Sequence, residues 1–92
     1  MKHDKKIIID FLSYLKDIRQ YSHHTIRSYG SDLEEYSLFC SHYDSKIIFY
    51  KLDHFAIKAY LQSFSKKGLS AKTLSRKLAS IKSFYKYLIK NK

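Results

Sequence analysis

Hydrophobic residues recur every three or four positions in four separate stretches of the chain, and this spacing predicts four α-helices. The predicted helices cover residues 5–20, 23–42, 54–67 and 71–89. Proline is absent and glycine occurs only twice, so little in the sequence interrupts helical structure. The pattern therefore predicts a small all-α bundle.

The apolar stripe of each predicted helix indicates which side chains form the core. In the first helix these residues are Ile8, Phe11, Leu12, Leu15 and Ile18. In the second they are Ile26, Tyr29, Leu33, Tyr36 and Cys40. In the fourth they are Leu74, Leu78, Ile81, Tyr85 and Leu88, with Phe84 at the margin. The opposite face of the fourth helix carries Lys72, Arg76, Ser83, Lys86 and Lys90, which are expected to face solvent.

The ends of the helices carry recognisable signals. Ser22, Asp53 and Ser70 are residue types that cap helix N-termini, and each stands directly before a predicted helix. Gly68 is expected to end the third helix in the left-handed conformation, with Leu69 packing back. Residues 46–50 have strand-like composition but no partner strand, so residues 43–52 are interpreted as a structured loop whose apolar side chains fill the core.

A chain of 92 residues with 45% hydrophobic content is expected to form one folded domain. Its single cysteine, Cys40, excludes an internal disulfide framework. The longest apolar runs fall well short of the ~18 residues of a membrane span, and the start of the chain does not resemble a signal peptide. A soluble, cytoplasmic protein without a membrane partner is therefore expected.

The charge of the chain is strongly asymmetric. The formal net charge is +10, and basic and acidic residues cancel through Asp53, so the whole surplus follows His54. A field of this size attracts polyanions and accelerates their association, although it does not determine the fold. Nucleic acid, an anionic membrane surface and an acidic protein all remain open as partners on charge alone.

Signals for catalysis or for metal binding are weak. Cys40 lies on the apolar stripe of its helix, which favours a buried structural role over a nucleophile. His23 and His24 are adjacent and point about 100° apart on a helix, so they lack the spacing of paired zinc ligands. No glycine-rich phosphate loop is present. The sequence predicts no catalytic site, no metal, no cofactor and no small-molecule ligand.

Binding chemistry is better represented, at the starts of the second and fourth predicted helices. Residues 22–28 and 70–77 each combine hydroxyl groups, the unpaired amides of a helix start and basic side chains. Arg27 and Arg76 are suited to guanine edges, whereas Thr25 and Thr73 are suited to phosphate oxygens or a thymine methyl group. Two such helix starts on one surface would form a DNA-binding platform.

Residues 21–40, with Ser22, Thr25, Tyr29 and Asp32-Leu33 in order, and residues 68–88 together resemble the N-terminal core-binding domain of tyrosine recombinases, the family of phage integrases and Xer resolvases. The resemblance covers roughly residues 7–90. It implies an orthogonally packed, four-helix SAM-like bundle over residues 1–92. It further implies double-stranded DNA at a recombination core site and other recombinase protomers as partners.

The resemblance also implies which residues contact DNA. Carried over by position, they are His24, Thr25, Arg27, Ser28, Lys72, Thr73 and Arg76. The catalytic residues of the family belong to a separate C-terminal domain, and their motifs do not occur in this chain. The chain alone is therefore not expected to be an enzyme, whereas its parent protein is expected to be a recombinase. A free-standing regulatory or architectural DNA-binding protein and a SAM-like protein–protein interaction module remain alternatives.

Overall fold

The computed structural model describes residues 2–44, 49 and 51–90, and it contains four α-helices. They are α1 (Lys2–Asp17), α2 (His23–Tyr43), α3 (His54–Lys66) and α4 (Ala71–Lys90). Within the described ranges there is no β-strand. The predicted all-α four-helix fold is confirmed, and α2, α3 and α4 have nearly the predicted bounds. The first helix begins and ends three residues earlier than the pattern indicated.

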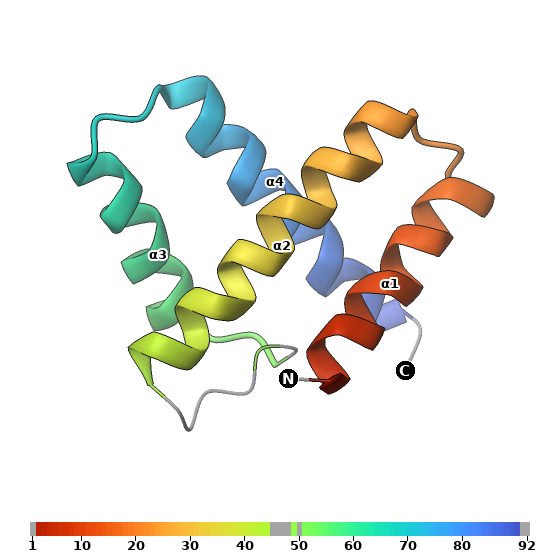
Figure 1. Cartoon of the computed structure of the whole chain (residues 1–92), viewed down its shortest axis with the longest axis horizontal. Coiled ribbons are helices and arrows are strands. Elements are labelled where there is room, and N and C mark those ends of the chain that lie inside the picture. Colours follow the sequence, from red (N-terminus) through yellow and green to blue (C-terminus); the bar gives the residue numbers. More distant parts are fainter. Residues whose placement is uncertain (1, 45–48, 50, 91–92) are drawn as a thin grey trace.

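The helices form two pairs that cross each other. α1 and α2 run in opposite directions and are joined by a short turn, as are α3 and α4, and α2 runs across α4 (Figure 1). The molecule measures 36 × 30 × 20 Å along its principal axes. Gly30 permits the close approach of α1 to α2, because a Cβ atom at this position would lie 3.0 Å from Leu12 Cδ1. The starts of α2 and α4 both lie at the upper edge in this view.

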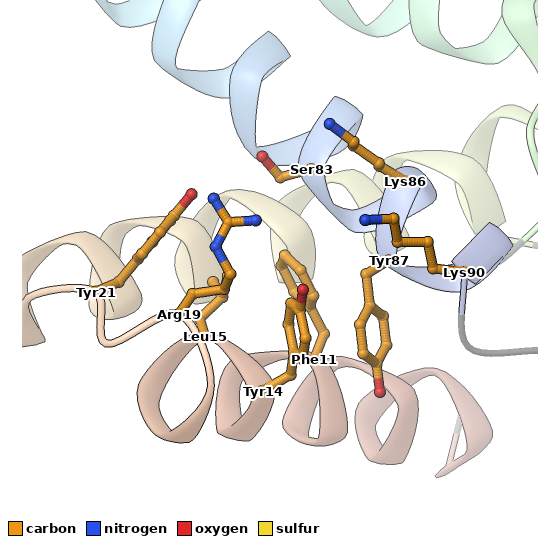
Figure 2. A pocket seen from close by; sticks show the side chains of 9 residues that line it. All are labelled: Phe11, Tyr14, Leu15, Arg19, Tyr21, Ser83, Lys86, Tyr87 and Lys90. Carbon is orange, nitrogen blue, oxygen red and sulfur yellow. The ribbon is translucent and has the colours of Figure 1, made fainter.

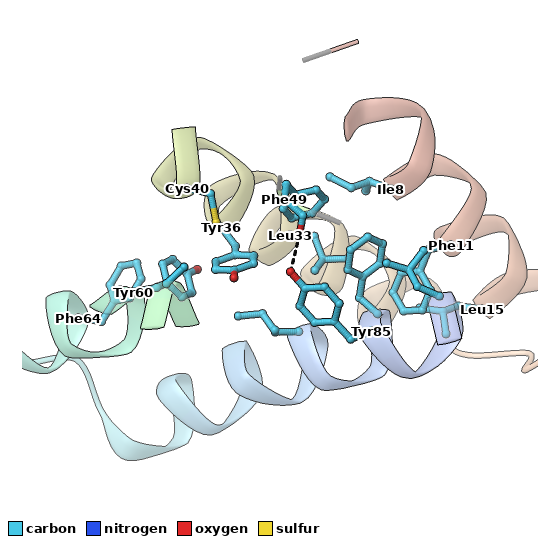
Figure 3. Close-up of a cluster of buried hydrophobic side chains, with 14 residues drawn as sticks. Ile8, Phe11, Leu15, Leu33, Tyr36, Cys40, Phe49, Tyr60, Phe64 and Tyr85 are labelled. Carbon is cyan, nitrogen blue, oxygen red and sulfur yellow. Dashed lines mark hydrogen bonds between the residues drawn. The ribbon is translucent and has the colours of Figure 1, made fainter. Parts of the chain in front are cut away.

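The core is built mainly from aromatic rings contributed by all four helices (Figure 3). Phe84 of α4 meets Phe11 of α1 edge to face, with ring centroids 5.4 Å apart, and stacks on Phe49 at 5.1 Å. Tyr36 of α2 meets Tyr60 of α3 at 5.1 Å. The Phe49 side chain is buried, which confirms that this residue of the predicted loop enters the core. Residues 45–48 and 50 of that loop lie outside the described residues.

The buried face of α4 differs from the predicted one. Phe84, expected at the margin, is fully buried, whereas Leu78, expected at the centre, is only half-buried. The face turns toward Phe84 because its ring packs against Phe11 of α1 and against Phe49, and because Lys77 occupies a buried position beside α2. Ile18 was also predicted in the core, but it lies beyond the end of α1 and is 69% exposed.

The predicted capping residues are confirmed at each helix end. Asp53 Oδ1 accepts the Ala56 amide at 3.0 Å, and Ser22 and Ser70 cap α2 and α4 in the same way. Gly68 has φ 78°, and the amide of Leu69 returns to the Phe64 carbonyl at 3.3 Å, as in a Schellman motif. The side chain of Leu69 does not pack back as expected, since it is 39% exposed.

Candidate nucleic-acid interface

The starts of α2 and α4 have the same local geometry. Ser22 Oγ accepts the Thr25 amide at 3.2 Å and lies 2.9 Å from the Thr25 hydroxyl oxygen. Ser70 Oγ accepts the Thr73 amide at 3.2 Å and donates to the Thr73 hydroxyl at 3.1 Å. These bonds satisfy the third amide of each helix, while the first two amides have no carbonyl of their own helix to bind. Each start therefore presents amide groups and a pair of hydroxyls to an approaching anion.

The electrostatics of these two starts differ from those of α3. The N-terminus of α3 is capped by the Asp53 carboxylate, which already places a negative charge at the positive end of that helix dipole. The caps of α2 and α4 are uncharged serines, and no acidic residue occurs in the first turn of either helix. Lys72 instead adds an exposed cation to the first turn of α4. The starts of α2 and α4 are therefore better suited than that of α3 to bind an external anion.

The structure places the predicted contact residues in the first two turns of α2 and α4, which lie at the same edge of the molecule (Figure 1). His24, Arg27 and Lys72 are exposed, whereas Thr25, Ser28 and Thr73 are half-buried. All seven residues, Arg76 included, therefore belong to two helix starts that lie at one edge of the molecule. The structure thus brings the two helix starts to one edge, and the contact of these residues with DNA stays a prediction.

The position of Arg76 in the sequence predicts a free side chain on the solvent face of α4. In the structure this side chain is instead paired with Asp32. Its Nε donates to Asp32 Oδ2 at 3.0 Å, and its Nη2 donates to Asp32 Oδ1 at 2.9 Å. The hydrogen bond with Asp32 raises the pKa of the guanidinium above its ordinary value. The Arg76 side chain remains 46% exposed, so Asp32 holds one edge of the planar group while another edge faces outward.

Asp32 is itself part of a buried network that connects three helices. The residue is 1% exposed, and its carboxylate also accepts a bond of 3.2 Å from the buried Lys77 ammonium group. Lys77 donates to Glu35 at 2.5 Å and lies 4.7 Å from the centre of the Phe64 ring. The Tyr60 hydroxyl donates to the same Glu35 oxygen at 2.6 Å. The network fixes α4 against α2 and α3, and so fixes the orientation of the two helix starts.

The network predicts a loss of stability in acid. Burial raises the pKa of Glu35, but the hydrogen bonds from Lys77 and Tyr60 outweigh it and hold the pKa below its ordinary value of 4.5. A carboxyl with a lowered folded-state pKa stabilises the fold above its unfolded pKa, and this contribution disappears as the pH falls through the folded value. We expect the melting temperature to fall between about pH 5 and about pH 3, and to fall less in Glu35→Gln. If thermal melts show that the melting temperatures of the parent and of Glu35→Gln fall equally with pH, this expectation is contradicted.

The tyrosines at the centre of the molecule are unsuited to attack a phosphate. Tyr36 and Tyr60 are completely buried, and burial raises the pKa of both phenols well above the ordinary value. Among the described residues, no three His, Cys, Asp or Glu side chains gather as a metal site. In the same part of the chain, no helix has both the length and the apolar composition needed to cross a bilayer. The arrangement favours binding over covalent chemistry.

Comparison with known proteins identifies the class to which this fold and platform belong. The chain belongs to the phage integrase N-terminal SAM-like domain family, whose model matches residues 8–92. It is 36% identical over 83 residues to the tyrosine recombinase XerC of Lacticaseibacillus casei, covering 90% of the chain and 28% of that protein. It is 30% identical to the tyrosine recombinase XerC of Bacillus licheniformis over its whole length and 30% of that protein. The chain thus spans less than a third of the relatives that it matches, and no solved structure matches it.

Proposed function

We propose that this chain is the DNA-contacting N-terminal domain of a site-specific tyrosine recombinase that acts in the cytoplasm. It binds double-stranded DNA at a recombination core site and contributes no catalytic group itself. The observation that carries the proposal is the pair of serine-capped helix starts without carboxylates, brought to one edge of a domain of the integrase family. The strand-exchange chemistry belongs to other parts of the protein, and other recombinase protomers are its partners on DNA.

The roles of the contact residues follow from their placement. The exposed amides and hydroxyls of both helix starts hold phosphate oxygens and set the register of the domain on the duplex. Arg27, which is exposed and forms no ion pair with any described residue, reaches base edges in the major groove. Arg76 does the same with a guanidinium whose orientation is fixed by Asp32. His24, Lys72 and the three hydroxyl residues complete the contact surface.

The proposal predicts weak, salt-dependent binding of the chain to duplex DNA, with little sequence preference. If about four phosphates are neutralised, the logarithm of the association constant should fall with the logarithm of the salt concentration at a slope of about −3.6. Fluorescence anisotropy with a labelled duplex at several salt concentrations measures this slope. A flat salt response would argue against the proposal and favour a protein–protein module.

A matched pair of variants separates the interface from general charge. Arg27→Ala should weaken DNA binding by about 1–3 kcal/mol, because it removes a contact at the start of α2. Lys6→Ala removes the same charge from the first half of α1, at the opposite edge of the molecule from the two helix starts (Figure 1), and should lower affinity by less than about twofold. Thermal melts of both variants should match the parent, since both side chains are exposed. Equal losses of affinity would show that the chain binds DNA by charge alone.

A further inference from the structure

A cavity outside the two helix starts collects cationic side chains from distant parts of the chain. It has a volume of about 140 Å³ and lies between α1, the turn that joins α1 to α2, and the second half of α4 (Figure 2). Arg19 contributes from the turn, and Lys86 and Lys90 contribute from α4. Figure 2 shows the Arg19 guanidinium and the Lys90 ammonium group pointing toward each other across the opening, above the rings of Phe11 and Tyr14.

Among the described residues, no carboxylate forms an ion pair with the cations of this cavity. No carboxylate lines the cavity, and every ion pair among the residues that the structure describes involves Asp32 or Glu35. Burial, and after it the charge of Asp10 on α1, raise the pKa of the Tyr87 phenol, but the hydroxyl of that ring points away from the Lys90 ammonium group in Figure 2. Like charges held together repel each other, and an anion between them replaces this repulsion by attraction.

The cavity also offers the shape and the donors that a tetrahedral anion requires. Arg19 is held beside the Tyr21 ring, with its guanidinium carbon 5.6 Å from the ring centre. The turn is set by Gln20, whose φ of 52° lets the Tyr21 amide bind the Leu15 carbonyl at 2.9 Å. The Ser83 hydroxyl lies beside the cations (Figure 2). A planar guanidinium, two ammonium groups and a hydroxyl suit the oxygens of a phosphate group.

We propose that this cavity is a binding site for one phosphate group, and that the group is a phosphodiester of the bound duplex. The assignment of this phosphate group to the DNA duplex rests on the proposed function. Tyr21, which lines the cavity, directly precedes Ser22, the cap of α2, so the cavity borders the DNA-binding platform. The site extends the contact surface to Arg19, a residue in the half of the chain that carries no net charge. Free phosphate is the other source of the same chemistry.

The test uses a duplex only long enough for one bound domain, so that few binding registers are available, and combines neutral methylphosphonate linkages, placed one at a time, with charge-removing variants of the chain. We expect one linkage at which neutralisation weakens binding of the parent chain about three- to tenfold, the size expected of one partly exposed charged contact. The same linkage should have little effect on binding by Arg19→Gln or Lys90→Gln. Lys82→Gln is the matched control, because Lys82 is an exposed cation of α4 that does not line the cavity. For this control variant, neutralising the same linkage should weaken binding as much as it does for the parent chain.

A second measurement distinguishes the sources of the phosphate and the failure of either proposal. ¹⁵N NMR follows the Arg19 side-chain Nε–H and the Ser83 amide during a titration with inorganic phosphate, against sodium chloride at equal ionic strength. A saturable change in chemical shift assigns the site to free phosphate if no methylphosphonate linkage has a penalty that the Arg19 and Lys90 variants remove. If neither the NMR shift nor a linkage with the expected penalty is observed, the phosphate site is refuted, even where the parent chain binds DNA. A parent chain that binds no duplex refutes the proposed function, and the phosphate titration then decides the cavity alone.

Discussion

Phe84→Ala is expected to lower the free energy of unfolding by about 3–5 kcal/mol, a large part of the total stability of a domain of this size. The Phe84 ring is fully buried and packs against rings from two other parts of the chain, as well as against its neighbour Tyr85. Its centroid lies 5.4 Å from that of Phe11, 5.1 Å from that of Phe49 and 5.5 Å from that of Tyr85. Alanine would leave a cavity that α1 and α2 cannot close without moving, since both helices are fixed by their other contacts.

Leu78→Ala is the matched control on the same helix. Because Leu78 is only half-buried and borders open grooves, its truncation should lower the free energy of unfolding by about 1 kcal/mol. Chemical denaturation of both variants, read by circular dichroism, gives the two values. A larger loss for Leu78→Ala than for Phe84→Ala would mean that the buried face of α4 is centred where the sequence pattern placed it.

The same two residues show how far the sequence could predict the fold. The helices, their caps and the stop at Gly68 depend on local interactions, and the pattern predicted all of them. The exact face that α4 buries depends on which neighbour each side chain meets, and periodicity alone does not contain this information. Leu78 and Phe84 both lie near the apolar stripe, and only the position of α1 and α2 decides between them.

The two helix starts of the candidate interface could be predicted because a helix start is a local feature, whereas their contact with DNA stays a prediction. The ion pairs behind the interface were not predicted, although the sequence contained a signal. Asp32 follows Tyr29 by three residues and precedes Tyr36 by four, so it lies within the apolar stripe of its helix. Lys77 precedes Ile81 by four residues and lies within the stripe of the fourth helix in the same way. A carboxylate in one apolar stripe and an ammonium group in another predict a buried ion pair, because either charge alone would be strongly destabilising there.

The network gives Arg76 a double role in the proposed interface. The guanidinium binds a buried carboxylate through Nε and Nη2, and the side chain is still 46% exposed. An arginine fixed in this way loses less side-chain freedom on binding than a fully exposed one. The arrangement also means that Arg76→Ala changes stability as well as binding, so Arg27 is the cleaner probe of base contact.

Asp32→Ala is expected to lower the free energy of unfolding by about 3 kcal/mol, because it removes the carboxylate shared by two cations. The Lys77 side chain is only 8% exposed, and without Asp32 it keeps Glu35 as its one carboxylate partner among the described residues. Arg76 is nearly half-exposed and can be hydrated, so the loss arises mainly from Lys77. Urea denaturation of the variant and its parent measures the change.

Two further variants test the source of that loss. Glu35→Ala removes a carboxylate that is 44% exposed and leaves Lys77 bound to Asp32, so it should lower the free energy of unfolding by about 1 kcal/mol or less. Asp32→Ala combined with Lys77→Met removes the buried charge together with its partner and should recover part of the loss, because an apolar side chain of similar length needs no counterion. If the double variant is no more stable than Asp32→Ala, the loss of one of the two carboxylate partners of Lys77 is not the cause. The loss would then reflect the packing of Asp32 against α4, and the network would fix the two helix starts by shape rather than by charge.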